Sequence, residues 1–227
     1  MPDLKGIILD VDGTLVDSNE AHVQAWVKAL KRGGYDVPAE RIRPLIGMGS
    51  DNLLPTLISI EKDTPEGEKL SEYWKEIFES EYLPSLKAFP KTKELLKRLK
   101  ADGFKLAVAS SAEKEMLKRL LEIAGADKLI EDETSADDAE NSKPDPDIVQ
   151  AALDKLALKS EQVVMLGDTP YDIEAATKIG VNVIALRCGG WNDDGLKGAI
   201  AIYDDPADLL AHLDDSPLAV KAQDKDK

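Results

Sequence analysis

Apolar residues in the second half of the chain follow two different spacings. Around 95–99, 116–121 and 148–156 they recur every three or four positions, which is the spacing of one helix face. Between these segments, and at the start of the chain, lie short apolar runs without a helical period: GIILD at 6–10, FKLAVAS at 104–110, VVML at 163–166 and VNVIAL at 181–186. This alternation predicts an α/β fold, in which a Rossmann-like parallel sheet has helices on both faces.

Residues 18–84 interrupt that alternation. One amphipathic pattern runs from Val23 to Leu30 and a second from Leu70 to Phe78, with no convincing strand between them. We therefore expect an all-helical insertion at 18–84 within an α/β core formed by 1–17 and 85–213. The charged segment 214–227 is expected to be a flexible tail.

Composition narrows the class of protein. The 227 residues are 43% hydrophobic and 32% charged, with no apolar run near the ~18 residues of a membrane span and no signal-peptide pattern. A net charge of −15 argues against nucleic acid or an anionic membrane as a partner. Cys188 is the only cysteine, so we expect no intrachain disulfide and a cytoplasmic protein. We also expect a monomer or a weak homodimer.

Polar residues follow three of the predicted strands. Asp10 and Asp12 follow the first, the pair Ser110–Ser111 follows the second, and Asp168 follows the run VVMLG, with Asp172 four residues on. Lys143 lies in a loop before a predicted helix. Because ligands bind at the carboxyl ends of parallel strands, these side chains are expected to converge.

This set of side chains suits phosphoryl transfer. Several carboxylates close together require a cation, and an all-oxygen ligand set favours Mg²⁺. Lys143 and the serine turn can hold phosphate oxygens, so the site would be locally positive in an acidic protein. One carboxylate can attack phosphorus while another, two residues along, transfers protons.

The ordered motifs DVDGTL, a strand-end serine, a lysine before a helix and GDTPYD resemble the haloacid dehalogenase-like hydrolase superfamily over about residues 5–213. The resemblance implies that 18–84 is a cap domain, which closes over the site and excludes water. It also implies the following roles: Asp10 as nucleophile and metal ligand, Asp12 as general acid/base and metal ligand through its backbone carbonyl, Asp168 as metal ligand, Ser110, Ser111 and Lys143 as phosphate-binding groups, and Thr14 and Asp172 as supporting residues.

Other interpretations of single residues compete with these roles. Asp168 could be the N-cap of a helix that begins in TPYDIEAAT. The stretch SNEAHVQAW resembles β-phosphoglucomutases, in which a histidine at the position of His22 assists the acid/base aspartate. Arg43 is a candidate for contact with the leaving group, by its place in the cap. Nothing in the sequence marks Cys188 as a low-pKa nucleophile.

The sequence thus predicts a Mg²⁺-dependent phosphatase of a small phosphomonoester, such as a sugar phosphate or phosphoglycolate. A β-phosphoglucomutase-like mutase is an alternative, but Ile46 and Ser50 replace the lysine and arginine of its cap loop. A phosphonatase would need a cap lysine, for which Lys28 and Lys31 are candidates. Three further alternatives are disfavoured. A haloacid dehalogenase lacks the second aspartate, which is present here as Asp12, and a non-enzymatic relative would have lost at least one of Asp10, Asp12, Lys143 or Asp168. A two-component receiver domain would be about half as long and would lack the insertion.

Overall fold

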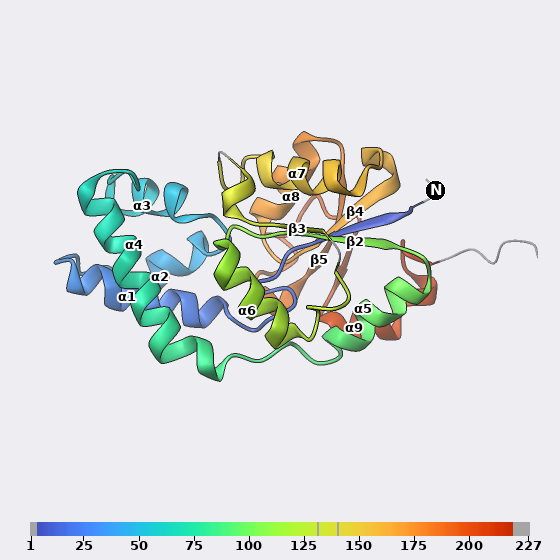
Figure 1. The fold of residues 1–227 in the computed structure, drawn as a ribbon, viewed down its shortest axis with the longest axis horizontal. Helices are drawn as coiled ribbons and strands as arrows, with labels where there is room; N and C mark the ends of the chain where they lie inside the picture. The colour runs from blue at the N-terminus through green and yellow to red at the C-terminus, as the bar shows by residue number, and fades with distance from the viewer. Residues whose placement is uncertain (1–3, 131, 140, 220–227) are drawn as a thin grey trace, which may run out of the picture.

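The structure, a computed structural model, describes residues 4–130, 132–139 and 141–219. In these residues the core is one parallel sheet in the order β3-β2-β1-β4-β5-β6, with helices on both sides (Figure 1). The strands are β1 Gly6–Leu9, β2 Lys105–Ala109, β3 Asp132–Thr134, β4 Val163–Gly167, β5 Asn182–Leu186 and β6 Ala201–Tyr203. The predicted α/β fold is confirmed.

The position of the central strand β1 explains why its sequence is apolar. β1 pairs with β2 on one side and β4 on the other, and all four of its residues are buried. Ile7 and Leu9 pack into the cluster under α5 and α6, whereas Ile8 packs into a second cluster with α7 and α8. Both faces of the sheet are therefore covered, which favours a continuous apolar run over an alternating one.

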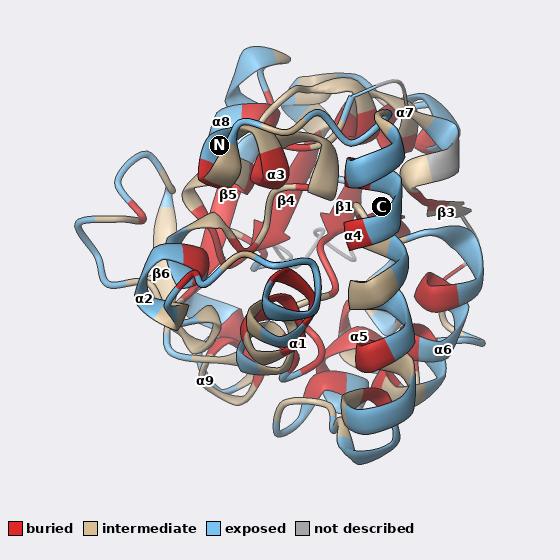
Figure 2. Cartoon of the chain, turned by 90° about the vertical axis from the view of Figure 1, so that its left-hand side faces the viewer, coloured by how far each residue is buried: buried red, intermediate tan, exposed pale blue. Residues whose placement is uncertain are grey.

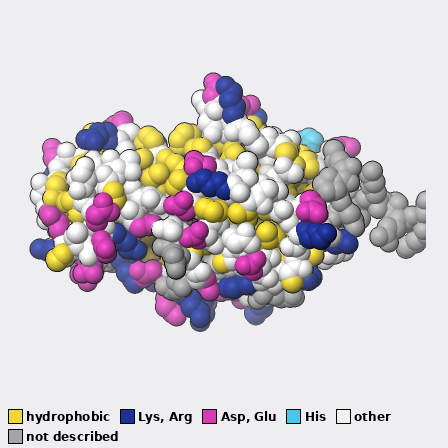
Figure 3. Space-filling view, turned by 90° about the horizontal axis from the view of Figure 1, so that it is seen from above, with side chains coloured by type: hydrophobic (Ala, Val, Ile, Leu, Met, Phe, Trp, Pro, Cys, Tyr) yellow, Lys and Arg dark blue, Asp and Glu magenta, His cyan; other side chains and the backbone are white. Residues whose placement is uncertain are grey.

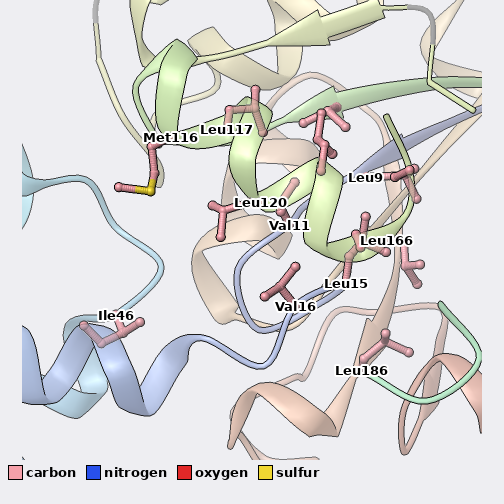
Figure 4. Close-up of a cluster of buried hydrophobic side chains, with 14 of the residues drawn as sticks. Leu9, Val11, Leu15, Val16, Ile46, Met116, Leu117, Leu120, Leu166 and Leu186 are labelled. Carbon is pink, nitrogen blue, oxygen red and sulfur yellow. The ribbon is translucent and has the colours of Figure 1, made fainter. Parts of the chain in front are cut away.

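Helices cover the sheet in two layers. On one face, Leu117 and Leu120 of α6 lie over Leu9, Val11 and Leu166 at the carboxyl end of the sheet (Figure 4). Buried residues concentrate in the strands and on the inward sides of the helices (Figure 2). The core helices are α5 Thr92–Ala101, α6 Lys114–Ala124, α7 Asp147–Leu156, α8 Pro170–Lys178 and α9 Pro206–Ala211.

Every regular element between β1 and α5 is helical. The α-helices are α1 Asn19–Arg32, the short α2 Ala39–Ile42, α3 Ser50–Ile58 and α4 Pro65–Ile77, followed by short helical turns up to Ser85. They form a body to one side of the sheet (Figure 1). The outgoing and returning segments are hydrogen-bonded, with Asp17 N donating to Lys87 O at 2.9 Å and Phe89 N donating to Leu15 O at 3.0 Å. The insertion therefore joins the core through two adjacent segments, and we refer to it below as the cap.

Several elements differ from expectation. The edge strands β3 and β6 were not predicted, because each has three residues, too few to show a period. Within the segment expected to be a flexible tail, Ser216 and Leu218 are buried; 220–227 lie outside the described residues. No helix among the described residues is both long and apolar enough to cross a membrane.

Candidate active site

The carboxyl ends of neighbouring strands bring three aspartates together. Asp10 follows β1 and Asp168 follows β4, and Asp10 N donates to Leu166 O at 2.9 Å, which ties the two strand ends. Asp172 comes from the first turn of α8. One carboxylate oxygen from each of the three lies within 4.8 Å of the others, and all three residues are buried. The convergence expected from the sequence is present.

Lys143 is the cation at this cluster. It is 1% exposed, its Nζ contacts a carboxylate oxygen of Asp10, and it donates to Asp172 Oδ1 at 2.7 Å. Burial lowers the pKa of Lys143, but the charges of Asp10 and Asp172 raise it more, so its pKa lies above the ordinary value. The ammonium group is therefore charged and held at the nucleophile candidate.

The carboxylates remain under strong mutual repulsion. Burial raises the pKa of Asp10 to about 7, against the lowering by Lys143, and Asp172 adds to the rise. Burial, then Asp10 and Asp172, raise the pKa of Asp168 well above its ordinary value. Three carboxylates with one ammonium leave negative charge that a divalent cation would balance. Because the donors are all oxygens, the cluster fits Mg²⁺.

Both oxygens of Asp168 are held by neighbouring side chains. Thr14 Oγ1 donates to Oδ1 at 2.8 Å, and Asn19 Nδ2 donates to Oδ2 at 2.9 Å. Thr14, expected to support the nucleophile loop, thus also orients the Asp168 carboxylate. Asn19 also donates to Gly189 O at 2.9 Å and was missed by the sequence analysis. No local pattern marks Asn19, because its partners lie about 150 or more positions away.

Asp172 links the lysine to the start of α8. Its Oδ2 accepts from Thr169 Oγ1 at 2.7 Å and from Thr169 N at 3.0 Å, while Oδ1 accepts from Lys143. Thr169 is the N-cap of α8 and forms a reciprocal capping box with Asp172. The alternative of Asp168 as N-cap is therefore wrong, and its carboxylate is available for another role.

Asp12 is directed to different partners from Asp10. Its Oδ1 accepts from Ser18 Oγ at 2.5 Å and lies 2.8 Å from His22 Nε2. Burial raises the pKa of Asp12, but His22 and the hydrogen bond from Ser18 outweigh it, so the pKa lies below its ordinary value. The His22 ring stacks on Phe78, with centroids 4.2 Å apart. The structure thus places His22 against the candidate acid/base, and Ser18 is a partner that sequence analysis missed.

The serine turn lies beside the cluster. Ser110 Oγ accepts from Ala112 N at 3.1 Å, which holds the turn before α6. Ser111 Oγ is buried without a hydrogen-bond partner among the described residues. Both serines line the same cavity as Asp10 and Lys143. Their placement is compatible with the predicted contact to phosphate.

Arg43 and Lys28 lie away from this arrangement, whereas Cys188 lies beside it without the features of a nucleophile. Arg43, the candidate for contact with the leaving group, is exposed and pairs with Glu20 at 2.9 Å. Lys28 pairs with Glu81 on the surface of the cap. The Cys188 thiol donates to Gly13 O at 3.3 Å, and burial, followed by Asp168, raises its pKa, which disfavours a thiolate nucleophile. Among the described residues, neither Arg43 nor Lys28 lines the cavity.

A cavity of about 540 Å³ lies between the cap and the core. Its floor includes Asp10, Asp12 and Lys143, and its other walls come mainly from α3, α4 and the loop at 46–50. Helix α3 contacts the core directly, since Asn52 Nδ2 donates to Ser142 O at 3.2 Å and to Lys143 O at 3.3 Å. The cap therefore covers the carboxylates and touches the segment that carries the lysine.

Comparisons with known proteins agree with this geometry. The family model described as haloacid dehalogenase-like hydrolase matches residues 7–186. A phosphoglycolate phosphatase of Aquifex aeolicus is 30% identical over 93% of this chain and 97% of its own, and a pyrophosphatase PpaX of Bacillus cereus is 26% identical over 79% and 82%. The crystal structure of a hydrolase from Pseudomonas syringae has a TM-score of 0.87 and 31% identity, over 93% of this chain and 98% of that one.

Proposed function

Because this chain belongs to the haloacid dehalogenase-like hydrolases, we propose that it is a Mg²⁺-dependent phosphatase that hydrolyses a small phosphomonoester through an aspartyl-phosphate. One observation carries the proposal: the floor of a single covered cavity holds a nucleophile candidate, a separate acid/base candidate and a buried lysine. The phosphatases among its relatives support the same reaction class.

The chemical steps use side chains that point in different directions. A carboxylate oxygen of Asp10 attacks phosphorus, and the bond between phosphorus and the ester oxygen breaks. Asp12 in its protonated form gives that proton to the departing alcohol, and the carboxylate so formed then removes one from the water that hydrolyses the aspartyl-phosphate. Lys143 contacts Asp10 and is placed to hold a phosphate oxygen. The cap limits the access of bulk water.

The metal would lie among the acidic side chains of the floor. Asp10 and Asp168 would hold Mg²⁺, together with the backbone carbonyl of Asp12, and Asp172 would support them through Lys143. When bound, Mg²⁺ supplies positive charge that offsets the carboxylates and the phosphate. Thr14 and Asn19 keep Asp168 in position for this role.

Phosphate release from a panel of phosphomonoesters tests the function. We expect release by the wild type with Mg²⁺ and none above background after EDTA treatment, with recovery on adding Mg²⁺ back. The panel should include p-nitrophenyl phosphate, whose hydrolysis depends little on specific contacts between the cap and the leaving group. No release from any ester in the presence of Mg²⁺ would exclude the proposed reaction.

Metal binding should also be visible without catalysis. Because the site gathers three buried carboxylates, Mg²⁺ should stabilise the folded chain by about 2.7 kcal/mol at a concentration 100 times its Kd. Urea unfolding with EDTA and with Mg²⁺ measures the difference. Asp168→Asn should lose most of it, whereas Asp36→Asn, at an exposed cap position, should keep it. An equal Mg²⁺ effect in both variants would place the ion elsewhere.

His22 is proposed to position Asp12. Replacing His22 by Ala should lower kcat by roughly 10- to 100-fold, because the 2.8 Å contact that orients the acid/base is lost. The same replacement in an Asp12→Asn background should add little, since residues acting as a unit are not additive. Initial rates of the wild type, both single variants and the double variant measure this coupling. Fully multiplicative losses would mean that His22 acts independently of Asp12.

The alternatives gain less support from the structure. The mutase alternative has the contact between His22 and Asp12, but Ile46 and Ser50 line the cavity where that family's cap loop is basic. Assaying β-glucose 1-phosphate with a bisphosphate primer for glucose 6-phosphate tests it. For a phosphonatase, Lys28 is paired with Glu81 and Lys31 is exposed, and neither lines the cavity in the described part of the chain.

The setting in the cell is also part of the proposal. We propose a cytoplasmic enzyme, monomeric or weakly dimeric, without nucleic-acid or membrane partners. Its single cysteine and net charge of −15 support this. On the face in Figure 3, basic side chains are interspersed with acidic ones and do not gather into a patch that would attract polyanions.

A further inference from the structure

The buried lysine of the floor is carried by a short core segment, residues 141–144, which we call the lysine segment. Other core elements hold both of its ends. Asp147, in the first turn of α7, accepts from Asn141 N at 3.1 Å and from Asn141 Nδ2 at 2.9 Å. At the other end, Lys178 of α8 donates to Pro144 O at 2.9 Å. Between these two anchors, the segment makes hydrogen bonds to the cap.

Two neighbouring side chains of the cap bind the middle of the lysine segment. At the start of α3, Asn52 Nδ2 donates to the backbone oxygens of Ser142, at 3.2 Å, and of Lys143, at 3.3 Å. Asp51 Oδ2 accepts from Ser142 N at 3.0 Å. The cap therefore binds one backbone donor and two backbone acceptors of consecutive residues. Because hydrogen bonds are directional, this set fixes the orientation of the backbone as well as its distance from the cap.

Glycines in the loop at 46–50 allow the cap to come this close to the core. A Cβ on Gly49 would lie 2.2 Å from Ser142 Oγ and 2.3 Å from Asp51 Oδ1. Gly47 has a φ of +108°, and a Cβ there would lie 2.6 Å from Cγ2 of Thr169, the N-cap of α8. A larger residue at either position would push the loop away from the core. The loop is therefore fitted to the arrangement in which the cap lies against the lysine segment and α8.

The contact at α8 involves the other group that fixes the lysine. Thr169 Oγ1 donates to Asp172 Oδ2 at 2.7 Å, and Asp172 Oδ1 accepts from Lys143 Nζ at 2.7 Å. The cap thus lies against both supports of the ammonium group. One support is the backbone that carries Lys143, and the other is the threonine that orients its carboxylate partner.

Asn52 has no direct access to a bound substrate. Among the described residues, Asp51 lines the cavity and Asn52 does not. Any effect of Asn52 on the reaction must therefore pass through the backbone that it binds. Lys143 is buried, so its stem has little freedom to compensate for a displaced backbone. A misplacement of about 1 Å at a reacting centre can lower a rate by about 100-fold.

We propose that Asp51 and Asn52 are positioning residues, through which the docked cap sets the place of the Lys143 ammonium group at the phosphate end of the cavity. This inference rests on the proposed phosphatase function. It gives the cap a role in assembling the phosphate site, in addition to excluding water. The cap would then act on the phosphoryl chemistry of every ester, whatever its leaving group.

Asn52→Leu tests this role at the residue that does not line the cavity. Leucine roughly keeps the size of the side chain but cannot donate to the two backbone oxygens. We expect kcat to fall roughly 3- to 10-fold, and by the same factor for every ester that the wild type hydrolyses, including p-nitrophenyl phosphate. The factor is the same because all esters share the phosphate. A residue that selects the leaving group would change the ratios between esters instead.

A double variant tests whether Asn52 acts through the lysine. In a Lys143→Met background, Asn52→Leu should lower kcat by less than about 1.5-fold, since the group that it positions is already gone. Initial rates of the wild type, the two single variants and the double variant give the coupling. The same factor in both backgrounds would show that Asn52 acts independently of Lys143 and would overturn the inference.

Glu79→Gln is the matched control, because it weakens a different contact between cap and core. Glu79 of the cap lies 3.9 Å from Arg119 of α6, and neither residue lines the cavity in the described part of the chain. Its kcat should stay within about twofold of the wild type. A fall equal to that of Asn52→Leu would show that the rate depends on cap docking in general, and not on these hydrogen bonds to the lysine segment.

Hydrogen exchange reports on the lysine segment without catalysis. The Ser142 amide donates to Asp51, so loosening of the junction should speed its exchange. Mass spectrometry of a peptide that contains Ser142 should show exchange at least about threefold faster in Asn52→Leu than in the wild type and in Glu79→Gln. Unchanged exchange in Asn52→Leu would mean that Asn52 does not hold the segment.

The outcomes separate this inference from the phosphatase proposal. If Asn52→Leu has the kcat of the wild type, or if its effect differs by more than about threefold between esters, the inference fails while phosphate release by the wild type still supports the function. If the wild type releases phosphate from no ester, the function fails and the inference fails with it.

Discussion

Replacing Asp10 by Asn should remove the proposed Mg²⁺-dependent phosphate release, with a fall in kcat/KM on the order of 10⁴-fold or more, because the amide cannot attack phosphorus. The change keeps the side-chain shape and removes one of three crowded carboxylates, so the fold should persist. Release of inorganic phosphate at saturating Mg²⁺ measures the activity, and circular dichroism checks the fold. Lys143 then keeps Asp172 as its carboxylate partner.

Asp36→Asn is the matched control for this change. Asp36 is exposed in the cap, so its replacement should leave kcat/KM within about twofold of the wild type, as is usual for surface positions. Trapping of ³²P on the wild type after rapid acid quenching, and its absence in Asp10→Asn, would identify the phosphorylated residue. Activity of Asp10→Asn within tenfold of the wild type would rule out Asp10 as the nucleophile.

Replacing Lys143 by Met should lower both activity and stability. The methionine roughly matches the length of the lysine stem but leaves Asp10 and Asp172 buried without their ammonium partner. Loss of one member of a buried ion pair costs about 3 kcal/mol or more, and loss of a phosphate-holding charge lowers kcat on the order of 10²- to 10³-fold. Urea unfolding in EDTA gives the stability, and initial rates with Mg²⁺ give the activity.

The dependence on Mg²⁺ distinguishes this mechanism from a simple packing defect. A divalent cation among the same carboxylates should recover part of the stability of Lys143→Met, because it replaces some of the missing positive charge. Lys155→Met is the control, since Lys155 pairs with Asp138 at 3.2 Å near the surface and should cost less than about 1 kcal/mol. Equal losses in the two variants would show that Lys143 has no special electrostatic role.

Local patterns predicted the parts of the fold that local physics controls. The run GIILD predicted a fully buried strand, and β1 is buried along its whole length, because sheet neighbours on both sides and helices on both faces leave it no polar surface. The same pattern could not predict β3 or β6, which are short edge strands. The pattern also did not predict the burial of Leu218, which packs into a cluster made of residues far from its own segment.

Some residues of the candidate site were also predictable from local sequence patterns, and others were not. Asp10, Lys143 and Asp168 were predicted because parallel strands have a common ligand-binding edge, so their order in the sequence implies proximity. Asn19 and Ser18 were not, because their partners are set by the way the cap joins the core. Arg43 was a candidate by its place in the cap, but Glu20 on α1 binds its guanidinium.

The order of residues alone therefore determines the fold class, the helical insertion and the chemical groups on the floor of the site. These follow from periodicity and from strand-end positions, which are properties of short segments. Only the tertiary structure shows that Asp51, Ser71 and Trp74, which are distant from the floor residues in the sequence, line the same cavity as Asp10 and Lys143. The shape of the cavity and the hydrogen bonds between cap and core depend on groups far apart in the chain, so no single segment contains them.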